Sequence, residues 1–128
     1  MSDHPRGSTY EVNIKKLYDI MNLEKNWNGN NADPIPENVI DNAHVLLDRV
    51  RDLKPEIFPT ATDSIQFEWF NDNDAYLEVE VRADNTATLF STKNGASPET
   101  NVFYREIPFD TIEIENYVKR FLYCEHLL

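Results

Sequence analysis

The residues of this chain that could do chemistry are carboxylates placed at every second position of short segments. Glu68 lies in one such segment, and Glu78 and Glu80 lie in the next. Side chains two apart on a β-strand share a face and stand about 6–7 Å apart, close to the spacing of successive phosphates along one nucleic-acid strand. Three interpretations are open: a surface that binds a basic groove, a divalent-metal or acid–base site, and an ordinary solvated face.

The pairing of the two segments decides whether these carboxylates meet. If a hairpin keeps both apolar rows on the core side, Glu68 lies opposite Glu78, and Gln66 lies opposite Glu80. Directly opposed like charges destabilise a sheet by some fraction of about 1 kcal/mol, so stability alone does not explain them. The candidate partner-binding residues are these carboxylates, two more in the adjoining turn and nearby aromatic anchors: Glu68, Glu78, Glu80, Asp72, Asp74, Phe70, Tyr76 and Phe90.

Catalysis and metal binding have less support in the sequence. A flat, exposed face offers little enclosure to shift a pKa or to complete a coordination shell. His4, His44 and His126 are scattered, Cys124 has acidic rather than basic neighbours, and three glycines are too few for a phosphate-binding loop. We therefore expect no catalytic residue, no metal and no cofactor.

The charge of the whole chain indicates the kind of partner. The chain has 23 Asp and Glu residues against 12 Lys and Arg, a formal net charge of −11. Such a surplus repels nucleic acid and lipid headgroups and attracts basic protein surfaces. No basic stripe interleaves with aromatic residues, as direct nucleic-acid binding would require. The expected partner is a basic protein, such as a nuclease or a toxin, rather than nucleic acid or a membrane.

Length and composition indicate a folded domain in a reducing compartment. A chain of 128 residues, 41% of them hydrophobic, can sustain one core, and we expect a flexible N-terminus over residues 1–8 and one domain over residues 9–128. No apolar run approaches the roughly 18 residues that cross a bilayer. The N-terminus has no signal-peptide pattern, and the single cysteine cannot form an internal disulfide. These features favour a cytoplasmic location.

Helical periodicity predicts three helices. Ser8 with Glu11 reads as a capping box that opens a helix over residues 9–23. Pro36 suits the first turn of a second helix, which should end before Pro55. Asp110 and Glu113 form a similar cap before a C-terminal helix. Each helix has one apolar stripe, and the C-terminal stripe consists of Ile114, Tyr117, Val118, Phe121 and Leu122.

Between the second and third helices the hydrophobic period changes to two, which indicates strands. We expect four strands, over residues 65–70, 77–82, 86–92 and 101–107, with residues 55–62 as a loop. Short links between them predict an antiparallel meander. The predicted fold is an α+β two-layer sandwich of order α-α-β-β-β-β-α, with helices covering one face of the sheet.

Trp27 lies in a polar loop and is open to two interpretations: a plug between two helices, its indole N–H bonded to a carbonyl, or an exposed anchor. Trp27-Asn28-Gly29, Ala32 and Pro34-Ile35 resemble the W-(D/N)-G-x-x-A-x-P-I segment of a group of small bacterial and phage-borne proteins. Similar strands follow in that group, although the turn at residues 71–75 lacks glycine here. The resemblance implies a phage or mobile-element context and a compact α+β fold, and it supplies no catalytic residue.

Taken together, these features predict a non-enzymatic acidic inhibitor or immunity-type protein. It would neutralise a basic nucleic-acid-processing protein in the manner of an anti-CRISPR protein or an antitoxin, by imitating the charge of DNA. The alternative is a structural or assembly module that forms homo-oligomers, for instance a homodimer. Its apolar contact would be made by Phe121-Leu122-Tyr123 and Leu127-Leu128.

Overall fold

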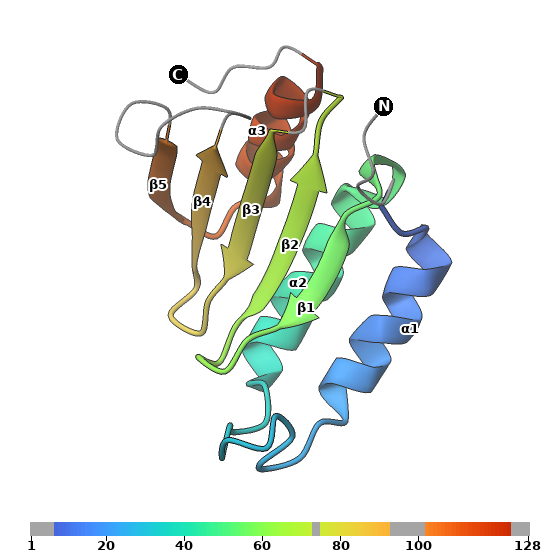
Figure 1. Ribbon diagram of the computed structural model, residues 1–128, viewed down its shortest axis with the longest axis vertical. Helices are drawn as coiled ribbons and strands as arrows, with labels where there is room; N and C mark the ends of the chain where they lie inside the picture. Colours follow the sequence, from blue (N-terminus) through green and yellow to red (C-terminus); the bar gives the residue numbers. More distant parts are fainter. Residues whose placement is uncertain (1–6, 73–74, 93–101, 124–128) are drawn as a thin grey trace.

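The computed structural model of the protein describes residues 7–72, 75–92 and 102–123 (Figure 1). Two helices come first, followed by a short 3-10 helix, five strands and a last helix. Their bounds are α1 Tyr10–Met21, α2 Glu37–Arg49, η1 Arg51–Leu53, β1 Glu56–Pro59, β2 Ile65–Phe70, β3 Tyr76–Val81, β4 Thr86–Thr92, β5 Val102–Pro108 and α3 Thr111–Tyr123.

The strands form one antiparallel sheet in the order β1-β2-β3-β4-β5, so each strand pairs with its neighbour along the chain. In Figure 1, α2 and α3 lie behind this sheet, and α1 lies beside α2 near the β1 edge. The α+β class and the antiparallel meander are therefore confirmed.

The predicted number of strands is wrong, because residues 56–59 form β1 instead of a loop. Proline residues stand at both ends of this segment, Pro55 before the strand and Pro59 as its last residue, and proline favours loops and strand edges. Only Ile57 of this strand is buried, paired with Phe67 of β2. A strand this short has too few residues to show an alternating pattern, so only its pairing with β2 reveals it.

The core lies between the sheet and the helices. Its largest fully buried side chains include those of Phe67, Leu77 and Leu89 from the sheet, and those of Leu46 and Ile114 from the helices. The predicted stripe of α3 is confirmed, with Leu122 half-buried and its other members buried. Burial of this apolar area is the main force that holds the two layers together.

The helix caps agree with the sequence at one end of the chain and differ by one residue at the other. Asp110 caps α3, since its carboxylate accepts hydrogen bonds from the N–H groups of Ile112 and Glu113. At α1 the cap is Thr9, whose hydroxyl accepts from the Val12 N–H, instead of the predicted Ser8. The Ser8 hydroxyl instead donates to Glu56 of β1, which fastens the chain before α1 to the sheet.

Buried polar groups tie the segments between these elements. Asn13 of α1 is completely buried, and its side-chain amide donates to the Pro55 carbonyl at 2.8 Å. The Trp69 indole donates to the Leu53 carbonyl at 3.0 Å. These bonds hold the chain as it turns from the helices into β1.

Trp27 is a plug between helices, as one of its two interpretations predicted. Its ring packs against the core, and its indole N–H donates to the Asp33 carbonyl at 2.8 Å. The loop around it contains positive φ angles at Asn26, Gly29 and Asn31, a conformation that glycine and asparagine adopt at the lowest cost. The positive φ angles therefore explain why this loop is rich in asparagine and glycine.

Among the helices of the described ranges, none is long and apolar enough to cross a membrane.

Candidate binding face

The face of the sheet opposite the helices is the candidate binding surface, and we call it the open face. Side chains alternate along each strand, so the residues that alternate with the buried ones belong to it. Its members are Glu56 and Phe58 of β1, Gln66, Glu68 and Phe70 of β2, Tyr76, Glu78 and Glu80 of β3, Thr86, Thr88, Phe90 and Thr92 of β4, and Val102, Tyr104, Glu106 and Pro108 of β5.

One row of side chains crosses all five strands of the open face. Glu68 pairs directly with Glu78, and Gln66 pairs with Glu80, so the predicted register is confirmed. The same row continues from Glu68 to Glu56 on one side and from Glu78 to Phe90 and Tyr104 on the other. The row thus has three carboxylates over β1–β3 and two aromatic rings over β4 and β5.

Neutral donors hold the opposed carboxylates in the middle of this row. The Gln66 side-chain amide donates to Glu68 and, at 3.3 Å, to the Tyr76 hydroxyl. Tyr76 in turn donates to Glu78 at 2.8 Å. Within the part of the chain that the structure describes, neither Glu68 nor Glu78 forms an ion pair. Their hydrogen bonds relieve the repulsion without neutralising the charge.

Glu56 differs from these two carboxylates because a cation balances it. Lys16 of α1 places its Nζ atom 3.0 Å from the Glu56 carboxylate. The same ammonium group lies 5.5 Å from the centre of the Phe58 ring. The uncompensated charge of the row therefore comes from Glu68 and Glu78.

Glu80 occupies the adjacent row and has its own set of partners. Ser64 donates to one carboxylate oxygen at 2.6 Å, and Thr88 donates to the other at 3.4 Å. Arg82 lies 3.7 Å from the carboxylate, at the outer limit of an ion pair. Glu80 is thus fixed in position and only partly neutralised.

The phenol of Tyr76 has a raised pKa. Half-burial on the open face is the largest cause, and the hydrogen bond to Glu78 and the charges of Glu68 and Glu78 add to it. Each of these disfavours the phenolate. Tyr76 therefore stays protonated and remains a donor to Glu78.

The remaining predicted residues lie at one end of the open face. Phe70 and Tyr76 pair across β2 and β3, and their ring centres are 5.2 Å apart. Asp72 is exposed in the turn that follows β2, whereas Asp74 lies outside the described residues. The structure thus brings Glu68, Glu78, Phe70 and Tyr76 together, with Glu80 beside them and Asp72 at the margin.

Some residues of the open face were missed by the sequence analysis. Tyr104, 63% exposed, follows Phe90 in the central row. Glu106 lies two residues further along β5 on the same face, and this spacing of two was a signal that could have found both. Glu56 and Phe58 had no such signal, because the strand that carries them was not predicted. Phe90 was predicted as an anchor, and it lies between Glu78 and Tyr104.

The described residues contain no group of three or more His, Cys, Asp or Glu side chains that could hold a metal ion. On the open face, the nearest partners of Glu68 and Glu78 are amide and hydroxyl donors. A donor hydrogen directed at a carboxylate oxygen competes with a cation for the same lone pair. These bonds engage one oxygen of each carboxylate, Oε2 of Glu68 and Oε1 of Glu78.

Comparison of the chain with protein families, with curated proteins and with solved structures found no match. The resemblance carried by the Trp27 segment therefore stays a prediction, and the function is argued from the open face.

Proposed function

We propose that the protein is a non-enzymatic acidic binding module whose open face engages a basic protein. The observation that carries this proposal is the directly opposed pair of Glu68 and Glu78, on a sheet face that no described helix covers. Opposed like charges lower stability. Their value therefore lies in a complex, where cations of a partner would pair with both.

The rest of the row that contains this pair adds aromatic side chains to the proposed binding surface. Phe90 and Tyr104 follow Glu78 on β4 and β5, so carboxylates and aromatic rings lie side by side. A guanidinium group bonds to carboxylates with its planar fork and stacks on aromatic faces. The open face is therefore best matched by arginine side chains projecting from a basic surface.

The two kinds of residue would contribute differently to binding. The net charge of −11 would speed association with a basic protein, an effect that salt weakens. Aromatic anchors would supply most of the affinity once they are buried. By imitating the charge of nucleic acid, the module would occupy the groove of a nuclease or another nucleic-acid-processing protein, in the manner of an anti-CRISPR protein or an antitoxin.

The alternative of an assembly module has less support from the positions of its residues. Phe121 is buried in the core, and Leu122 is half-buried against it. Tyr123 is 70% exposed, and Leu127-Leu128 lies outside the described residues. Phe121 is therefore not available for the proposed apolar contact between copies.

Affinity capture from a bacterial lysate at low and moderate salt, read by mass spectrometry, tests the proposal. The baits are the native protein, the double variant Glu68→Gln/Glu78→Gln, and a control, Glu24→Gln/Asp52→Asn, that removes the same charge from exposed sites away from the open face. We expect a basic protein to bind the native bait and the control and to be lost from the open-face variant.

The captured protein would then be purified and its association rate measured against each bait. Equal binding by all three would contradict the role of the open face. Capture of an acidic protein, or binding that does not weaken with salt, would contradict the role of charge.

A further inference from the structure

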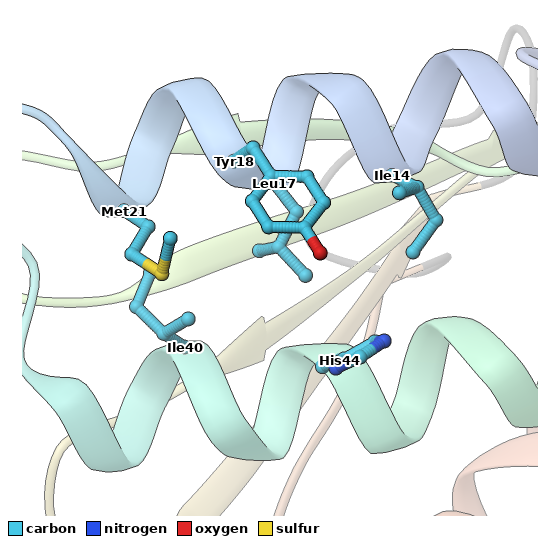
Figure 2. Close-up of a pocket in the computed structure, with 6 residues that line it drawn as sticks. All are labelled: Ile14, Leu17, Tyr18, Met21, Ile40 and His44. Atoms are coloured by element: carbon cyan, nitrogen blue, oxygen red, sulfur yellow. The ribbon is translucent and has the colours of Figure 1, made fainter.

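A groove runs between α1 and α2, in the helix layer and therefore on the other side of the sheet from the open face. Figure 2 shows its lining, four side chains from α1 and two from α2 that point into the space between the helices. They are Ile14, Leu17, Tyr18, Met21, Ile40 and His44. Five of the six are apolar or aromatic, so the groove is a hydrophobic surface with one imidazole at its border.

Burial divides this lining into a floor and a rim. Leu17 and Ile40 are 6% and 8% exposed, whereas Tyr18 and Met21 are 58% and 48% exposed. Exposed apolar side chains that gather around a groove, rather than lying singly on the surface, are a feature of interaction sites. The volume of about 60 Å³ is well below the roughly 300–1,000 Å³ of pockets that enclose small molecules. It suits individual side chains of a larger partner.

The dimensions of the groove match a helix. Ile14, Tyr18 and Met21 follow one another at intervals of four and three along α1, on one face over about two turns, or roughly 10 Å. A partner helix would place apolar side chains at the same intervals. Grooves of this kind receive the apolar face of an amphipathic helix.

The flank of the groove formed by α2 is acidic. Positions 37, 41 and 48 lie, at 100° per residue, on the outer side of α2 next to Ile40 and His44. All three are exposed acidic residues, Glu37, Asp41 and Asp48. Asp48 accepts a hydrogen bond from Tyr10 of α1, and the Arg51 guanidinium lies 3.9 Å from the centre of the Tyr10 ring, so the excess negative charge of this flank is at Glu37 and Asp41. The α1 flank is mixed, with Glu11 and Lys15. The two flanks of the hydrophobic groove therefore differ in charge, so a basic partner would turn its positive side chains toward α2.

We propose that this groove binds an amphipathic helix of a basic partner, with its apolar ridge against Tyr18, Met21 and the floor and its Lys or Arg side chains along the acidic flank of α2. A second copy of the chain is a poor occupant, because it would bring a further charge of −11 to an acidic border. The proposal does not rest on the function assigned to the open face, since the two surfaces share no residue.

A synthetic peptide of about four helical turns, or about 14 residues, provides the probe. It carries Leu at the ridge positions, Lys and Arg along one flank and Ala elsewhere. A second peptide has the same composition in shuffled order, which keeps the charge and removes the ridge. Binding is followed by NMR chemical shifts of the protein and by titration, in the native chain and in Glu68→Gln/Glu78→Gln. The Glu68→Gln/Glu78→Gln variant has lost two charges of the open face, so peptide binding that persists in this variant is attributed to the groove.

We expect the ridged peptide to shift Ile14, Tyr18, Met21, Ile40 and His44 in both backgrounds, and to bind at least about tenfold more tightly than the shuffled one, as loss of buried apolar anchors predicts. Tyr18→Ala/Met21→Ala should weaken it by a similar factor without unfolding the protein, because both side chains are largely exposed. Val12→Ala/Ile112→Ala, which removes exposed apolar groups outside the groove lining, should leave the affinity unchanged.

The charge of the flank has its own test. Glu37→Gln/Asp41→Asn should weaken binding of the ridged peptide at low salt and have little effect at high salt.

Three results would overturn the proposal: equal binding of the two peptides, shifts confined to the open face, or full affinity in Tyr18→Ala/Met21→Ala. Shifts of groove residues with protein concentration alone would overturn the choice of occupant in favour of a second copy.

Discussion

Glu68 and Glu78 face each other across β2 and β3, and each is held by a neutral donor, Gln66 for the first and Tyr76 for the second. Since Gln66 also donates to the Tyr76 hydroxyl, the four side chains form one continuous hydrogen-bonded chain. The donors fix the carboxylates close together without supplying positive charge. In the complex that we propose, cations of the partner would supply that charge.

Removing one charge of this pair should stabilise the isolated protein. Glu68→Gln keeps an acceptor for Gln66 and removes the repulsion from Glu78, so we expect the free energy of unfolding to rise by a fraction of about 1 kcal/mol. Chemical denaturation measures this change, with Glu24→Gln as a control that should have no effect. A fall in stability would mean that the Glu68 carboxylate supports the fold.

Tyr76 should make stability sensitive to alkaline pH. Its folded-state pKa is raised, by burial first and then by Glu78, whereas in the unfolded chain it is about 10. Above pH 10 the unfolded state loses this proton more readily than the folded state, so stability falls as pH rises. We expect Tyr76→Phe to show a shallower fall above pH 10 in denaturation curves. A parallel fall in both proteins would contradict the raised pKa.

The same substitution should have a cost at neutral pH. Tyr76→Phe removes the donor to the half-buried Glu78 carboxylate, which should lower the free energy of unfolding by about 1 kcal/mol. Thermal unfolding at pH 7 measures it. Tyr104→Phe is the matched control, because Tyr104 is exposed on the same face and its change should be close to zero.

Asn13 should be essential to the junction between α1 and β1. Asn13→Ala leaves the Pro55 carbonyl without its donor in a buried setting, at an expected cost of about 1–3 kcal/mol. Asn22→Ala removes an exposed amide that donates to the Tyr18 carbonyl of its own helix, so its effect should be within about 0.5 kcal/mol. Equal effects in calorimetry would contradict the role assigned to the buried amide.

The identity of the α1 cap can be tested with two neighbouring hydroxyls. Thr9→Ala should cost about 1 kcal/mol, because the Val12 N–H loses its acceptor. Ser8→Ala removes only a donor to Glu56, which keeps its Lys16 partner, and should cost less. Helix content by circular dichroism and denaturation distinguish them, and the reverse order would restore Ser8 as the cap.

The parts of the fold that could be predicted are those in which one face of an element is buried. The register of β2 against β3 followed from the sequence because a slip by one residue would expose both apolar rows. The α1 cap was displaced by one residue because Ser8 and Thr9 are both good caps, and only the contact of Ser8 with Glu56 separates them.

Only the part of the candidate site that lies on the β2–β3 hairpin could be predicted from the sequence. Glu68, Glu78 and Tyr76 lie on adjacent strands joined by a short turn, so local pairing brings them together. The continuation of the row to Glu56 and Tyr104 depends on the order of all five strands. The groove between α1 and α2 depends on how two helices pack, which the periodicity of each helix does not determine.

The two edge strands of the sheet differ in how readily each could pair with a strand of another molecule. β1, at one end, is four residues long, and proline flanks or ends it at Pro55 and Pro59. Proline has no N–H with which to pair an incoming strand, so this border resists extension. β5, at the other end, has seven residues, and its proline is the last of them, Pro108. If copies of the protein pair edge to edge, we therefore expect β5 rather than β1 to make the contact, and a proline substitution within β5 to disfavour it.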